Sequence, residues 1–211
     1  MGKLTAQLKE SQFDFVHHSQ AVFKILMMAL AFPGKVGKLE PINLATNRYH
    51  TVLQCMLSLL DHETSFAVIA DDSEEKSYVA KYLEVNTGSN QSALTTADFV
   101  LCLANNSSGL FSTLKRGDLE RPDKSATIFY YVDSISDSFK SEHKKLTFMG
   151  PGIQNKNIVC IKGLDIKEVY AWKQSRGDYP LGCDIYCVST EGHVIGIPRS
   201  TDIVSIDEQG G

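Results

Sequence analysis

An arginine beside two hydroxyl residues is the first candidate for chemistry in this sequence. Pro198 precedes Arg199, and Ser200 and Thr201 follow it. A guanidinium group next to hydroxyl groups is suited to hold a phosphate or a carboxylate. Asp184 lies on the other strand of the same predicted hairpin, so an ion pair between Arg199 and Asp184 is equally possible. The sequence leaves both roles of Arg199 open.

A glycine turn is the second candidate. Gly150-Pro151-Gly152 follows a predicted strand, and backbone N–H groups in such turns can face an anion. However, proline has no N–H, and neither a GxGxxG nor a Walker A pattern is present. A sharp turn at the end of the strand is the alternative interpretation. The predicted anion site consists of Arg199, Ser200, Thr201, Gly150 and Gly152.

The histidines and cysteines predict neither a metal site nor a nucleophile. His17 and His18 are adjacent on a predicted helix, so their rings point about 100° apart and cannot share a metal. The five cysteines form no CxxC pair and have no zinc-like spacing. A GxSxG motif is also missing. We therefore expect histidines with structural or surface roles, buried reduced thiols, no catalytic residue, no metal and no cofactor.

Helical periodicity predicts the elements of the first half of the chain. A helix is expected from Phe15 to Ala31, with Phe15, Val22 and Phe23 among its core-facing residues. A second helix is expected from about Asn43 to Leu60. A third follows the capping box of Asp72 and Glu75 and ends at Gly88. Short apolar runs at 66–70 and 99–104 between and after these helices predict buried strands.

The sequence of the second half of the chain predicts mostly strands. A polar segment, 105–124, predicts a long surface loop with one short apolar element around 110–114. Strands are expected at 127–132, 145–149 and 158–161, and a short helix at 166–174. The runs 184–188 and 193–197 predict a hairpin. This order favours an α/β fold whose mixed sheet is parallel early, antiparallel late and flanked by helices.

Composition excludes several classes of protein. The 211 residues carry a net charge of −4, so the chain lacks the basic footprint of a nucleic-acid-binding protein. Its longest apolar run, Ile25–Phe32, is far shorter than the roughly 20 residues of a membrane span, and we expect a core helix there. The sequence predicts a cytoplasmic protein with one domain over 1–211, a core at about 13–204 and a loose tail at 205–211.

Three stretches of the chain resemble one family. Ser19–Gly34 is similar to the family's opening helix, with its phenylalanine–basic pair and terminal Pro-Gly, and Leu59–Thr64 resembles its helix-to-strand corner. The most specific stretch runs from Tyr179–Asp184 to Ile197–Thr201, with Gly150–Ile153 upstream. The family is PhnH, a subunit of the bacterial carbon–phosphorus lyase system for phosphonate breakdown. One departure is Lys24 where the family usually has arginine, which removes a bidentate fork.

The resemblance implies a fold, partners and a role. The fold would be a reduced version of that of PLP-dependent transferases, but no lysine has a persuasive Schiff-base context, so PLP is not expected. The partners would be PhnG, PhnI and PhnJ-like subunits of a core complex that couples a phosphonate to the ribose of ATP, and a homodimer is implied. The leading hypothesis is an assembly subunit that contacts partners through a sheet edge or an exposed apolar helix face. The alternative is a stand-alone phosphonate- or nucleotide-binding protein or transferase that uses Arg199, Gly150 and Gly152.

Overall fold

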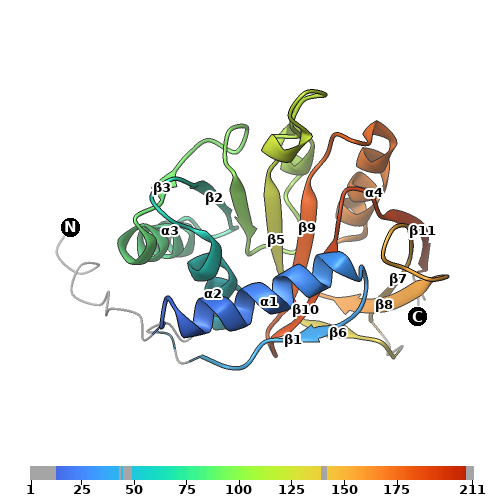
Figure 1. Cartoon of the computed structure of the whole chain (residues 1–211), viewed down its shortest axis with the longest axis horizontal. Coiled ribbons are helices and arrows are strands. Elements are labelled where there is room, and N and C mark those ends of the chain that lie inside the picture. Colours follow the sequence, from blue (N-terminus) through green and yellow to red (C-terminus); the bar gives the residue numbers. More distant parts are fainter. Residues whose placement is uncertain (1–12, 43, 45–48, 139–141, 208–211) are drawn as a thin grey trace.

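A seven-stranded mixed sheet forms the centre of the molecule (Figure 1). The computed structural model describes residues 13–42, 44, 49–138 and 142–207. The strand order is β1-β10-β9-β5-β4-β2-β3. In chain order the strands are β1 (Gly37–Lys38), β2 (Ser65–Ile69), β3 (Asn90–Gln91), β4 (Phe99–Cys102), β5 (Thr127–Val132), β9 (Asp184–Ser189) and β10 (His193–Ile197).

The large sheet is parallel early in the chain and antiparallel late. Strands β2, β3, β4, β5 and β9 run parallel. The β9–β10 hairpin and the short edge strand β1 are antiparallel. Strands β2, β4 and β9 are almost entirely buried, as expected for strands covered on both faces. The predicted α/β class, mixed sheet and hairpin are therefore confirmed.

A second, antiparallel sheet was not predicted. Its order is β11-β7-β8-β6, and its strands are β6 (Ser134–Ser136), β7 (Lys144–Met149), β8 (Asn157–Lys162) and β11 (Asp202–Asp207). The strands expected at 145–149 and 158–161 exist, but they belong to this sheet and not to the central one. The predicted tail is wrong for 205–207, because β11 pairs with β7 as far as Asp207. Residues 208–211 lie outside the described residues.

Helices cover one face of the large sheet, and a mixture of elements covers the other. Helices α1 (His17–Ala31), α2 (His50–Leu59) and α3 (Ser73–Thr87) share one apolar core with the sheet. Helix α4 (Ile166–Ser175), the short 3₁₀ element η1 (Leu110–Thr113) and the small sheet share the other. Strand β5 shows this division, since Ile128 and Tyr130 face one core and Phe129 faces the opposite one.

Sequence signals predicted both ends of α3 correctly but placed the start of α2 too early. Asp72 caps α3 by accepting hydrogen bonds from the backbone N–H groups of Glu74 and Glu75, and Gly88 ends the helix in the left-handed conformation, as predicted. Helix α2 begins only at His50, later than expected, and the predicted cap Asn43 lies outside the described residues. No helix of the described segments is long and apolar enough to cross a membrane.

The loop between β4 and β5 is partly buried in the core. It contains η1 and a second 3₁₀ turn, η2 (Pro122–Lys124). The predicted short apolar element is confirmed, and two of its side chains, Phe111 and Leu114, are buried. They pack into the core that also contains Trp172 of α4. The loop is therefore anchored at its middle while its polar parts stay at the surface.

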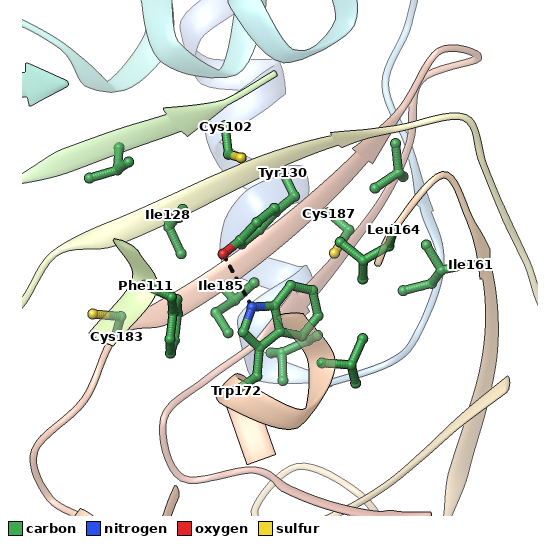
Figure 2. Packing of buried hydrophobic residues seen from close by; sticks show 14 of the residues in the cluster. Cys102, Phe111, Ile128, Tyr130, Ile161, Leu164, Trp172, Cys183, Ile185 and Cys187 are labelled. Atoms are coloured by element: carbon green, nitrogen blue, oxygen red, sulfur yellow. Dashed lines mark hydrogen bonds between the residues drawn. The ribbon is translucent and has the colours of Figure 1, made fainter. Parts of the chain in front are cut away.

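A buried hydrogen-bonded trio fixes α4 against the large sheet. The indole N–H of Trp172 donates to the hydroxyl of Tyr130 at 3.2 Å. Figure 2 shows the two groups pointing toward each other. That hydroxyl donates to a carboxylate oxygen of Glu168, whose other oxygen accepts the backbone N–H of Ser107 at 3.1 Å. Burial and the nearby Glu168 raise the pKa of Tyr130 well above its ordinary value. These contacts join α4, β5 and the loop after β4.

Two close approaches hold α1 on the sheet. The hydroxyl of Tyr186 on β9 donates to the backbone carbonyl of Leu26 at 3.0 Å. Further along the helix, Gly196 of β10 lies against the backbone of Ala29 and Leu30, so that a Cβ there would come within 2.7–2.8 Å of backbone atoms. A glycine is required where two backbones meet so closely. The position of α1 therefore depends on β9 and β10.

We expect Gly196→Ala to destabilise the fold by roughly 1–3 kcal/mol, because its methyl group would push the α1 backbone away from β10. Urea unfolding followed by circular dichroism measures the loss. Gly177→Ala is the matched control, since a Cβ at Gly177 meets no atom within 4 Å and its φ lies outside the left-handed region. Equal stabilities for the two variants would contradict the close approach.

Candidate functional site

The guanidinium of Arg199 is already occupied by protein groups. Its Nη2 lies 2.6 Å from Oδ2 of Asp184 and its Nε 3.2 Å from Oδ1. The backbone N–H of Arg199 also donates to Oδ1 at 2.9 Å, and Nη1 donates to the carbonyl of Pro122. The side chains of Arg199 and Asp184 are only 17% and 19% exposed. Of the two roles left open by the sequence, the structure contains the ion pair.

The glycine turn meets this segment but also supports α1. A Cβ at Gly150 would lie 2.9 Å from the carbonyl oxygen of Ser200 and 3.3 Å from Cα of Thr201, so three of the five predicted residues come together. A Cβ at Gly152 would lie 2.2 Å from the carbonyl oxygen of Ala31. Gly150 accepts a hydrogen bond from the N–H of Ile153, which closes a turn. The turn therefore has three structural contacts. It follows the last residue of β7, approaches Ser200 and Thr201, and packs against the last residue of α1.

Two other arginines near Arg199 are also engaged within the chain. Buried Arg176 donates to the carbonyls of Cys183 and Ile197, and burial lowers its pKa to about 10. Arg116 pairs with Asp178 at 2.8 Å. Thr201 is fully buried, and its hydroxyl, like Nε of Arg176, has no hydrogen-bond partner among the described residues. The contacts of the three arginines make the corner a mostly internally paired cluster at the amino end of β9, whereas ligands of open α/β sheets bind outside the carboxyl ends.

The cysteines are buried and unbridged, as predicted. Burial raises the pKa of Cys102 to about 12 and that of Cys183 to about 11, and the thiols of Cys55, Cys160 and Cys187 are shifted in the same direction. Such thiols are almost fully protonated at neutral pH and are poor nucleophiles. Within the described ranges, no three His, Cys, Asp or Glu side chains are grouped so that they could hold a metal.

The outward side of α1 exposes large apolar side chains. Phe23, Met27, Met28 and Phe32 are 41–52% exposed, and we call these four residues with Lys24 the α1 face. The helix buries Val22, Leu26 and Ala29 on its other side. The expectation that Phe15 and Phe23 face the core is wrong, since both are about half exposed. The predicted core helix is therefore only half buried, and its other half is an apolar surface.

A pocket of about 200 Å³ lies beside the α1 face. Its walls come from α1 and from the segment that leads into β1. The apolar lining includes Ile25, Met28, Phe32 and Val36, and Lys24 and Lys35 also line it. Two larger depressions of about 520 and 510 Å³ adjoin it and share Val36 in their walls. The α1 face thus borders a groove that passes the start of edge strand β1.

The charges along the α1 face have one sign. No Asp or Glu occurs from residue 15 to residue 39 of the sequence. Lys24 and Lys35 form no ion pair with any carboxylate of the described residues, and Nζ of Lys35 lies 5.6 Å from the centre of the Phe32 ring. Exposed apolar residues bordered by polar ones are typical of protein-interaction sites. The geometry therefore supports a docking surface here.

The sequence did contain a signal for this surface. The run Ile25–Phe32 has eight consecutive apolar residues, and a helix can turn only part of such a run toward a single core. With Phe23, the run makes the helix apolar on nearly every side. An apolar helix at the edge of a fold must therefore expose some of these side chains.

Comparisons with known proteins agree with one another. The family model described as "Bacterial phosphonate metabolism protein (PhnH)" matches residues 11–204. A putative C-P lyase subunit protein HtxG of Stutzerimonas stutzeri is 28% identical over 193 residues, which cover 87% of this chain and 85% of the relative. The alpha-D-ribose 1-methylphosphonate 5-triphosphate synthase subunit PhnH of Rhizobium meliloti (strain 1021) is 28% identical over 200 residues, 90% of this chain and 92% of the relative. Because the family model covers nearly the whole described chain, this protein belongs to the PhnH family.

Proposed function

We propose that this protein is a subunit of a carbon–phosphorus lyase core complex and acts mainly by assembly with PhnG, PhnI and PhnJ-like subunits. The complex would form ribose 1-phosphonate 5-triphosphate from ATP and an alkylphosphonate. Family membership supports this role, as do two relatives that carry the word subunit in their names. The observation that carries the proposal is the exposed apolar α1 face, because such a surface favours a protein partner.

Three further statements belong to the same proposal. The chain works as one domain over 1–211 in the cytoplasm, without PLP, and its fold is a reduced form of the PLP-dependent transferase fold. The isolated protein forms a homodimer. The shared apolar core supports the one-domain proposal, because side chains from the large and the small sheet pack together in one cluster.

The alternative is a stand-alone phosphonate- or nucleotide-binding protein or transferase. Its predicted anion site is Arg199, Ser200, Thr201, Gly150 and Gly152. The contacts of Arg199 favour the assembly role, because an anion would have to displace Asp184 from a two-point ion pair. Calorimetric titration of the isolated protein with ATP and alkylphosphonates tests the alternative, and binding that Arg199→Ala abolishes without unfolding would support it.

Co-purification tests the assembly role directly. The untagged chain is produced together with its tagged PhnG, PhnI and PhnJ counterparts, and the complex is isolated by affinity and size-exclusion chromatography. The proposal expects this chain in stoichiometric amounts with the other three subunits. Assembly of those three without this chain, under conditions where it is folded, would overturn the proposal.

A further inference from the structure

The pocket beside α1 has the size and lining of a site for one partner side chain. Its volume of about 200 Å³ is below the roughly 300–1,000 Å³ of small-molecule sites. The walls that Ile25, Met28, Phe32 and Val36 contribute are apolar, as in the pockets that receive anchor residues at protein interfaces. Met28 is also flexible enough to adapt to the shape of an inserted group. The pocket therefore suits an apolar side chain of a protein.

Two lysines make the rim of this pocket positively charged, which favours a partner with negative charge. Lys24 and Lys35 both line the pocket, and neither is paired with a carboxylate of the described residues. Asp137 lines the two adjoining depressions but not this pocket. The chain as a whole is acidic, with a net charge of −4, so a basic patch on it is a local feature. Carboxylates on a partner would complement these lysines and guide its approach.

A second copy of this chain fits the α1 face poorly. A symmetric contact would place the same surface on both sides, and no acidic residue occurs between 15 and 39 to meet Lys24 and Lys35 of the other copy. Like charges at an interface disfavour association. A head-to-tail contact with an acidic region of another copy would not close into a dimer. The charge pattern therefore favours a different chain.

From these observations we infer that the pocket formed by Ile25, Met28, Phe32 and Val36 receives an apolar side chain from an acidic amphipathic segment of a partner subunit, with carboxylates of that segment paired to Lys24 and Lys35. The inference rests on the proposed assembly role and adds the chemistry of the partner segment. It places the contact at the C-terminal half of α1, which Gly196 and Gly152 hold against the rest of the fold.

A charge-reversal experiment on the reconstituted complex tests the inference. The variant is Lys24→Glu with Lys35→Glu, and its affinity for the purified PhnG, PhnI and PhnJ counterparts is measured at low and high salt. We expect at least tenfold weaker association at low salt and a smaller difference at high salt, because screening weakens charge pairing. The matched control is Lys76→Glu with Lys167→Glu, which reverses two exposed lysines of α3 and α4 and leaves the affinity unchanged.

The outcomes separate the inference from the proposed function. Failure of the wild-type chain to associate would overturn both. If the wild type associates and the charge-reversed variant binds with the same affinity, the proposed function stands but the inference of an acidic partner segment is overturned. Tighter binding by the charge-reversed variant would also overturn it, because it would show that the partner segment is basic. Sedimentation of the isolated proteins adds a second readout, because loss of self-association in the reversed variant alone would make a second copy the occupant. Unchanged circular dichroism shows that the variants are folded.

Discussion

Replacing Asp184 by alanine is expected to lower the free energy of unfolding by roughly 1.5–3 kcal/mol, the scale for hydrogen bonds to charged groups, because its ion pair with Arg199 is only partly exposed to water. Asp184 accepts hydrogen bonds from Nε, Nη2 and the backbone N–H of Arg199. Its charge also favours the ionised form of nearby Arg176, which donates to the carbonyl groups of Cys183 and Ile197. Without Asp184, two guanidinium groups would remain in a corner with little access to water. Urea unfolding at neutral pH measures the loss.

A nearby exposed pair provides the control for this prediction. Asp123 lies 3.8 Å from Nε of Arg121, and both side chains are at least 60% exposed. Asp123→Ala is expected to change the stability by less than about 1 kcal/mol, as is usual for exposed pairs. A double-mutant cycle with Arg199→Ala then gives the coupling energy of the Arg199–Asp184 pair. A loss below about 1 kcal/mol for Asp184→Ala would show that the pair is not structural and would return Arg199 to the list of ligand-binding candidates.

The double variant Phe23→Ser with Met27→Ser is expected to weaken assembly with the partner subunits by about 30-fold or more. Buried aromatic anchors often contribute about 2 kcal/mol or more to an interface, which corresponds to this factor. Phe23 and Met27 are one turn apart on α1 and are about half exposed in the isolated chain. Their replacement removes little core packing, so the stability of the isolated protein should change by less than about 1 kcal/mol.

An exposed apolar residue elsewhere controls for general effects of lost hydrophobicity. Val85 on α3 is 56% exposed and lies outside the α1 face. Val85→Ser should leave both stability and assembly unchanged. Affinities are measured by titration of each variant into the other three purified subunits. Equal assembly by the α1 variant and the wild type would show that the partner contacts a different surface.

Features that depend on neighbouring residues in the chain were predictable from the sequence. Asp72 and Gly88 lie within a few residues of the backbone groups they satisfy, and both ends of α3 were located correctly. The β9–β10 hairpin was found for the same reason. Such signals require no knowledge of distant contacts.

Features set by distant contacts were harder to predict. Strands β7 and β8 were recognised, but nothing in their own residues says that they pair with β11 and β6 instead of the central sheet. The predicted tail included the last residues of β11. In the structure the register of this strand shifts between Ile203 and Ser205, which interrupts the alternation of apolar and polar residues. For Phe23, the apolar character was evident, but its exposure depends on which side of α1 meets β10.

The candidate sites show the same distinction. Arg199 has a residue type that suits either an anion or a carboxylate partner, and only the fold brings Asp184 within 2.6 Å of it. The role of Gly152 could not be read from its turn, because the backbone it approaches belongs to Ala31, far away in the sequence. The α1 face was open to prediction, since a helix that is apolar all round must expose part of its surface when it lies at the edge of a core.

Methionine oxidation offers the most direct test of the central claim that the α1 face is covered in the assembled complex. Met27 and Met28 are 50% and 47% exposed, Met149 on β7 is 39% exposed, and Met56 is fully buried. Brief treatment with hydrogen peroxide and mass spectrometry give the oxidation rate of each residue in the isolated chain and in the complex. The account predicts that Met27 and Met28 react readily in the isolated chain and several times more slowly in the complex, while Met149 stays reactive and Met56 stays protected. Equal rates for Met27 and Met28 in the two states would contradict it.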